Sequence, residues 1–134
     1  MPAASTALLD INVLVALFFA DHIHHELAHD WFTVHRKNGW ATCPLTENGF
    51  VRVACQQPSD EGLLRPADVV AALRQLSADK YHRAWSDTVR LADASLFAPE
   101  FIRGASQITD VYLLGLAKTQ GGYLATFDRS IPLK

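Results

Sequence analysis

The stretch QITDVYLLGLAKTQGGYLATFD, near the C-terminus, constrains the fold more than any other part of the chain. It begins with a hydroxyl and a carboxylate suited to cap a helix, and mostly apolar positions follow, which predicts a buried helix over residues 109–120. The glycine pair 121–122 supplies the left-handed backbone that ends such a helix. Tyr123–Phe127 is then an apolar run of strand length. This order places Asp110 and Asp128 where both carboxylates can point into one crevice, at the edge of a sheet where ligands bind.

Two earlier acids repeat this placement. Ala7–Leu9 is a candidate buried strand that ends at Asp10, and Asn12 could cap the helix that follows it. Trp40–Cys43 is again strand-like, and a proline suited to the first turn of a helix comes next. Glu47 lies in the first turn of that helix. All four acids are therefore expected at the same edge of the sheet.

Amphipathic helices are also predicted between the strands. The segment from His24 to Arg36 is expected to bury one face, and so is the segment from Pro66 to Ala78. In the first of these, the side chains expected to face inward are Leu27, Ala28, Trp31, Phe32 and His35. Residues 81–96 fit either a short strand or a helical turn. Because strands alternate with helices, residues 1–134 are expected to form a single α/β domain, with a central, mostly parallel sheet flanked by helices on both faces.

Four carboxylates in one crevice repel one another unless a cation lies between them. Oxygen-rich sites with few His or Cys ligands suit Mg²⁺ or Mn²⁺. The expected metal ligands and catalytic residues are Asp10, Glu47, Asp110 and Asp128, with Asn12 and Thr126 in supporting positions. Taken singly, each acid has an ordinary alternative role as a helix cap or first-turn residue. The hypothesis therefore rests on the four occurring together.

The net charge of −2 argues against a surface that holds nucleic acid by charge alone. It does not argue against a nuclease, because metal ions bound at carboxylates can engage phosphate oxygens themselves. Arg129 and Arg52 are the candidate phosphate-binding side chains. For either one, a solvated surface position is the ordinary alternative.

Four sequence blocks resemble the signature blocks of PIN-domain ribonucleases, and in particular those of the VapC toxins of bacterial toxin–antitoxin pairs. They occur in the order of the family: DINVL at 10–14, TENGFVR at 46–52, TDVYLLGLA at 109–117 and TFDR at 126–129. The resemblance implies a PIN-like fold and gives the four acids named above the role of the acidic metal-binding quartet. One departure is Ser130, where some members carry a further acid. It leaves open whether one or two metal ions bind.

The resemblance also implies an activity and partners. The activity is Mg²⁺- or Mn²⁺-dependent hydrolysis of RNA, with tRNA or another structured RNA as substrate. Attack by an activated water molecule would leave 5′-phosphate and 3′-hydroxyl ends. The implied partners are a second copy of the chain, in a homodimer, and a cognate VapB-type antitoxin whose C-terminal segment covers the toxin and blocks its site.

A competing motif, HELAH at residues 25–29, matches the helical zinc signature H-E-x-x-H. A zinc metallopeptidase that uses His25, Glu26 and His29 is therefore one alternative. It lacks an obvious third ligand, because His82 stands apart from any further metal motif, and a partly solvated helix face is the ordinary explanation of this histidine-rich segment. A second alternative is a non-catalytic module that keeps the fold and binds only a protein partner, although such a module has no use for four gathered carboxylates.

The remaining sequence features concern location. Cys43 and Cys55 are the only cysteines, and their spacing matches neither a disulfide framework nor a thiolate zinc site. The apolar run from Val13 to Ala20 is too short to span a bilayer, and no positively charged segment precedes it as in a signal peptide. A soluble cytoplasmic protein without membrane contact is expected.

Overall fold

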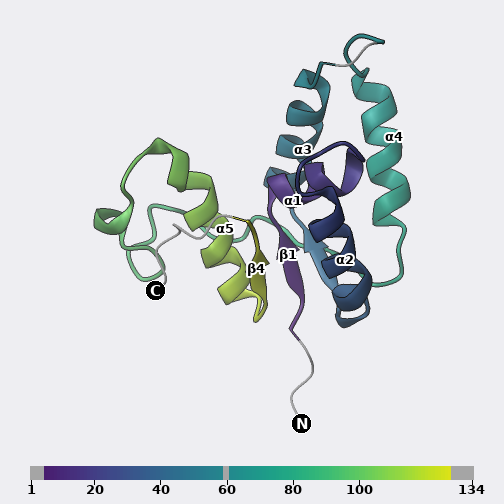
Figure 1. Ribbon diagram of the computed structural model, residues 1–134. Coiled ribbons are helices and arrows are strands. Elements are labelled where there is room, and N and C mark those ends of the chain that lie inside the picture. Colours follow the sequence, from purple (N-terminus) through teal and green to yellow (C-terminus); the bar gives the residue numbers. More distant parts are fainter. Residues whose placement is uncertain (1–4, 59–60, 128–134) are drawn as a thin grey trace.

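The computed structural model describes residues 5–58 and 61–127, and its centre is a parallel β-sheet (Figure 1). The strands in chain order are β1 (Ala7–Leu9), β2 (Trp40–Thr42), β3 (His82–Ala84) and β4 (Tyr123–Ala125). They lie side by side in the order β3-β2-β1-β4, and each neighbouring pair runs parallel. The α/β class and the parallel sheet predicted from the sequence are therefore confirmed.

Helices cover both faces of this sheet, as Figure 1 shows. One face carries α1 (Ile11–Phe18), α2 (His25–His35), α3 (Pro44–Gln56) and α4 (Pro66–Ser77), whereas the other carries α5 (Ile108–Thr119). Three short 3-10 turns complete the described secondary structure: η1 (Arg36–Asn38), η2 (Pro99–Phe101) and η3 (Ala105–Gln107). Proline occupies the first position of both α3 and α4, where its missing N–H costs nothing.

The strand β1 shows how the two faces are filled. Ala7 and Leu9 belong to a core cluster with residues of α1, α3 and α4, whereas Leu8 between them belongs to a second cluster with Leu113 and Leu116 of α5. Successive side chains of a strand point to opposite faces. The uninterrupted apolar run of β1 is therefore required, because each of its faces is covered by helices.

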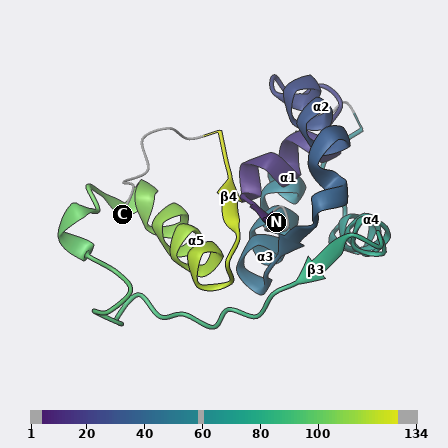
Figure 2. The same cartoon turned by 90° about the horizontal axis from the view of Figure 1, so that it is seen from below.

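The region left open by the sequence, residues 81–96, begins with the edge strand β3 and continues as irregular chain. Figure 2 shows this connection leaving β3, running along the lower part of the view past β4, and reaching the side of α5 that faces away from β4. Backbone N–H of Trp85 donates to Thr42 O at 2.8 Å, which fastens the start of the connection to β2. Val89 and Phe97 are buried against the α5 face, so the connection contributes to the second core cluster.

The carboxyl ends of the strands meet along one edge of the sheet, which is called the carboxyl edge below. β1 leads through Asp10 into α1, and β2 leads through Cys43 into α3. Because α5 returns through a tight turn into the parallel strand β4, its first turn lies at the same edge. A Cβ at Gly49 would overlap the Ile11 side chain, so this glycine lets the first turn of α1 approach α3 closely.

Four details of the sequence interpretation are wrong. Asp10, rather than Asn12, caps α1, because strand β1 ends one residue before it. α5 begins at Ile108, since η3 runs directly into it and supplies the preceding turn, so Asp110 lies inside the first turn and is not its cap. Of the glycine pair, only Gly121 has a left-handed backbone, with φ +75°. Leu27 is 61% exposed, because it borders an open groove beside β4 and none of the described elements covers it.

Within residues 5–58 and 61–127, no helix is both long and apolar enough to cross a membrane.

Candidate active site at the carboxyl edge

Asp10 is the most buried acid of the candidate site, with 3% of its surface exposed. Its Oδ1 accepts a hydrogen bond from backbone N–H of Ile11 at 2.7 Å, and its Oδ2 accepts one from Thr126 Oγ1 at 2.8 Å. Backbone N–H of Asp10 donates in turn to Ala125 O at 3.0 Å. The carboxylate is therefore fixed between the start of α1 and the end of β4, with Thr126 in the supporting position expected from the sequence.

Glu47 lies in the first turn of α3 and is half-buried. Its Oε2 accepts a hydrogen bond from Thr42 Oγ1 at 2.6 Å, and the same hydroxyl lies 2.7 Å from His82 Nε2. Burial lowers the pKa of His82, and the charges of Glu47 and Asp79 act in the opposite direction. Thr42 ends β2 and His82 begins β3, so two neighbouring strands support this carboxylate.

Asp110 lies in the first turn of α5 and is half-buried. The N-terminal turn of a helix carries partial positive charge, which stabilises an anion there. Asp10 is the N-cap of α1, and Glu47 lies in the first turn of α3. Three helix N-termini, each with its own carboxylate, thus border the carboxyl edge.

The donor set at this edge fits a hard divalent cation, because it consists of carboxylate and hydroxyl oxygens. Asp10, Glu47 and Asp110 would be the residues that hold such an ion. Among the described residues, however, no three His, Cys, Asp or Glu side chains converge on a common point as a metal centre requires. Asp128, the fourth expected ligand, and Arg129, the expected phosphate contact, lie outside the described residues.

The PIN-domain family matches residues 7–133, which is nearly the whole chain. The chain belongs to the PIN-domain family.

Named relatives of this PIN domain are VapC proteins of Mycobacterium tuberculosis. Ribonuclease VapC44 is 42% identical over 127 residues, which cover 95% of this chain and 89% of that protein. Ribonuclease VapC38 is 44% identical over 128 residues, covering 93% of this chain and 86% of the relative. The recognition of a VapC-type PIN domain from the sequence is therefore confirmed.

A solved structure agrees with the fold of this PIN domain. It is the crystal structure of Mycobacterium tuberculosis VapC20, which is described as a toxin that cleaves the sarcin–ricin loop. The TM-score is 0.67 over 92% of this chain and 91% of that chain, at 12% sequence identity. This likeness concerns the fold alone.

Asn12 and Arg52 of this PIN domain are both exposed. Asn12 lies in the first turn of α1, close in sequence to Asp10, so a supporting role for it remains a prediction. Arg52 follows Glu47 by five positions on α3, which turns it about 140° away around the helix axis. A phosphate contact from Arg52 stays a prediction and requires substrate that wraps around α3.

The HELAH segment occupies the first turns of α2. His25 Nδ1 lies 2.7 Å from Ala16 O, which identifies that nitrogen as a donor to the carbonyl. The rings of His25 and His29 are 5.8 Å apart between centroids. No third protein ligand joins them among the described residues, so in this part of the chain the zinc motif lacks its required context.

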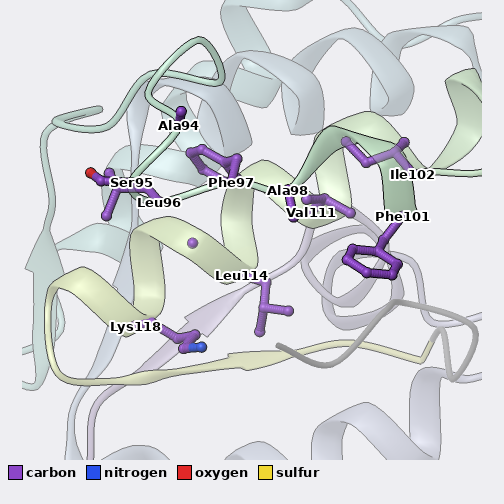
Figure 3. Close-up of a pocket in the computed structure, with 11 residues that line it drawn as sticks. Ala94, Ser95, Leu96, Phe97, Ala98, Phe101, Ile102, Val111, Leu114 and Lys118 are labelled. Carbon is purple, nitrogen blue, oxygen red and sulfur yellow. The ribbon is translucent and has the colours of Figure 1, made fainter.

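A separate cavity of about 270 Å³ lies between the 94–102 segment and α5. Figure 3 shows Phe97, Phe101 and Leu114 around it, with Lys118 at one end. Its lining is mainly apolar and includes no carboxylate. Although α5 carries both this cavity and Asp110, the cavity does not share the chemistry of the carboxyl edge.

Sequence reasoning missed two polar side chains of the site, Thr42 and His82. The signal for Thr42 was present, since it lies within the predicted strand Trp40–Cys43, just before the first turn that carries Glu47. His82 lay at the start of a segment whose structure the sequence left open, so nothing in the pattern placed it beside β2.

Proposed function

We propose that this protein is a metal-dependent endoribonuclease of the VapC type, which hydrolyses RNA phosphodiester bonds at the carboxyl edge. The observation that carries the proposal is the placement of Asp10, Glu47 and Asp110 in first-turn or cap positions of three helices at one sheet edge. The ribonuclease names of relatives that match nearly the full chain support it.

The described side chains have distinct tasks in this proposal. Asp10 is held by Thr126 and by backbone N–H of Ile11, so its carboxylate has a defined direction before any ion binds. Glu47 is oriented in the same way by Thr42. A bound Mg²⁺ or Mn²⁺ supplies charge neutralisation at the phosphate and lowers the pKa of a coordinated water molecule. Asp110, and Asp128 beyond the described residues, complete the proposed acidic quartet.

The bond changes determine the products. Oxygen of water bonds to phosphorus while the bond from phosphorus to the 3′ oxygen breaks, so the products carry 5′-phosphate and 3′-hydroxyl ends. A 2′,3′-cyclic phosphate end would require attack by the ribose 2′-hydroxyl, and finding it would contradict this mechanism. The proposed substrate class is structured RNA such as tRNA, encountered in the cytoplasm.

The proposed partners are a second copy of the chain, in a homodimer, and a VapB-type antitoxin. An apolar groove of about 340 Å³ between α2 and β4 is the proposed binding site for an antitoxin segment. Leu27 and Trp31 line it from α2, and Thr126, which holds Asp10, lines it at the end of β4. A chain segment bound in this groove would reach the carboxyl edge and could block it.

The test is cleavage of purified RNA by the protein in EDTA, Mg²⁺, Mn²⁺ or Zn²⁺. Wild type is compared with Asp10→Asn, and Glu26→Gln serves as the matched control because it makes the same carboxylate-to-amide change at an exposed position in α2. His29→Ala removes one histidine of the zinc motif without disturbing the hydrogen bond between His25 and Ala16.

We expect Mg²⁺ or Mn²⁺ to restore cleavage after EDTA, and Asp10→Asn to abolish it. Glu26→Gln and His29→Ala should cleave like wild type. Activity that depends on Zn²⁺ and disappears in both α2 variants would support the peptidase-type motif instead. Absence of cleavage by folded wild type on every RNA and with every ion would contradict the proposed function.

A further inference from the structure

A hydrogen-bond chain links β3 to the candidate site through β2. His82 Nε2 lies 2.7 Å from Thr42 Oγ1, and Thr42 Oγ1 lies 2.6 Å from Glu47 Oε2. Thr42 is fully buried, with none of its surface exposed, whereas His82 and Glu47 are half-buried. The central link is therefore shielded from solvent, where competition by water for its hydroxyl is weakest.

The direction of these hydrogen bonds follows from the number of hydrogens. A threonine hydroxyl has one hydrogen to donate, and ionised Glu47 can only accept. Thr42 must then donate to Glu47, so the hydrogen between Thr42 and His82 belongs to Nε2 of the histidine. Both the imidazolium and the neutral ring with hydrogen on Nε2 supply it.

The register of the sheet explains why His82 reaches Thr42. Trp40 of β2 pairs with His82 of β3, and side chains two residues apart on a strand share a face. Trp40 and Thr42 therefore lie on the same face as His82. The ring of Trp40 packs against that of His82, with centroids 4.5 Å apart, and holds it beside the hydroxyl.

We propose that His82 is a positioning residue for the carboxyl edge, which acts through Thr42 to hold the Glu47 carboxylate in the orientation that binds a divalent cation. The inference rests on the proposed function, because it takes Glu47 as a cation ligand. His82 itself faces Thr42 and does not touch the cation or the RNA. Partners of this kind typically change metal affinity by about 10- to 100-fold when they are removed.

The experiment measures Mn²⁺ affinity without RNA, by the electron paramagnetic resonance signal of free Mn²⁺, together with the Mg²⁺ dependence of RNA cleavage. Thr42→Val removes the hydroxyl and keeps the shape, whereas Thr42→Ser keeps the hydroxyl. His82→Phe keeps a ring against Trp40 but has no N–H, whereas His82→Gln restores an N–H donor. Urea unfolding of each variant shows that it is folded at the start of the titration.

We expect Thr42→Val and His82→Phe to bind Mn²⁺ about 10-fold more weakly and to need correspondingly more Mg²⁺ for half-maximal cleavage. Thr42→Ser and His82→Gln should regain most of that affinity. The double variant Thr42→Val/His82→Phe should bind no more weakly than Thr42→Val alone, because His82 acts only through the hydroxyl. Additive losses, or no loss in folded single variants, would overturn the inference.

Glu47→Gln distinguishes failure of this inference from failure of the proposed function. If Glu47→Gln loses Mn²⁺ binding and cleavage while Thr42→Val keeps both, the positioning role is wrong and the nuclease site stands. If Glu47→Gln binds Mn²⁺ and cleaves RNA like wild type, the proposed role of Glu47 is wrong, and the inference is overturned with it.

Discussion

Trp40 is the largest fully buried side chain of the described residues, and its indole N–H needs a partner. Nε1–H donates to Asp79 Oδ2 at 2.7 Å, and Arg36 donates to the same carboxylate from Nε at 3.2 Å. Burial raises the pKa of Asp79, but the hydrogen bonds from Arg36 and Trp40, the charge of Arg36 and a backbone hydrogen bond from Tyr81 together outweigh it, so the pKa lies below its ordinary value of 3.8. This acid fixes the ring that packs against His82.

Asp79→Ala is expected to destabilise the fold, because it leaves the buried N–H of Trp40 without its acceptor. Such a loss costs about 1 to 3 kcal/mol in free energy of unfolding, measured by urea denaturation at neutral pH. The sign of the pH dependence follows from the lowered pKa of Asp79. Its contribution is fully present above pH 3.8 and is lost as the pH falls through the lower pKa of the folded state.

The wild type should therefore lose more stability between neutral pH and pH 3 than Asp79→Ala does. Parallel stability curves for the two proteins across this range would show that Asp79 carries no such contribution. The measurement is the urea concentration at the midpoint of unfolding, taken at a series of pH values for both proteins. The midpoints can be compared directly if the slope of the unfolding free energy against urea concentration is unchanged.

At the level of single residues, the sequence predicted where Asp10, Glu47 and Asp110 lie relative to the strands and helices, and it did not predict the side chains that support Glu47. Asp10, Glu47 and Asp110 all lie at the carboxyl edge as expected, since strand and first-turn positions can be read from local patterns. The support given to Asp10 by Thr126 was anticipated. That given to Glu47 by Thr42 and His82 was not, because it depends on which strand lies beside β2.

At the level of elements, the turn from α5 into β4 decides how close β4 can lie to β1. Gly121 has φ +75°, which glycine adopts without strain, and nothing lies near the position of its missing Cβ. Gly122 is different. A Cβ there would overlap the backbone oxygen of Thr6 and approach Trp85 to 2.9 Å, so glycine is needed for space rather than for a left-handed backbone.

Gly122→Ala is expected to lower the free energy of unfolding by about 1 to 3 kcal/mol, because backbone must move to admit the methyl group. Gly121→Asn is the matched control, since asparagine tolerates the left-handed region and this site has open space. Urea denaturation of both variants makes the comparison. A larger loss in Gly121→Asn than in Gly122→Ala would contradict this assignment of the two glycines.

Element positions were predictable where a strong local signal marked them. Proline gave the start of α3 and of α4, and the apolar run gave the whole of β1. The start of α5 was misplaced because η3 leads into it and takes over the role of a capping side chain. The strand β3 could not be predicted, since it is three residues long and exposes Arg83 and Ala84.

For the whole molecule, the alternation of strands and helices was enough to predict a parallel sheet covered on both faces. The strand order β3-β2-β1-β4 could not be predicted from the sequence, because the pattern of residues shows which segments are strands but does not show which strands are neighbours. That order determines the chemistry. It brings the end of β4 against Asp10 on one side of β1, and it brings β3 against Thr42 on the far side of β2.

The proposed nuclease activity depends on Asp10, Glu47 and Asp110 forming one cation site. The most direct test is Mn²⁺ titration, followed by electron paramagnetic resonance, of wild type and of Asp10→Asn, Glu47→Gln and Asp110→Asn. Glu26→Gln again serves as the exposed carboxylate control. Asp110→Asn should remain at least as stable as wild type without metal, because relief of repulsion among the acids compensates the lost helix-end interaction of about 0.3 to 1 kcal/mol.

We predict that each of the three site substitutions weakens the same Mn²⁺ binding event by at least about 10-fold, as removal of even an outer-shell partner does, while Glu26→Gln leaves it unchanged. Three folded variants that bind Mn²⁺ as tightly as wild type would contradict a common cation site at the carboxyl edge.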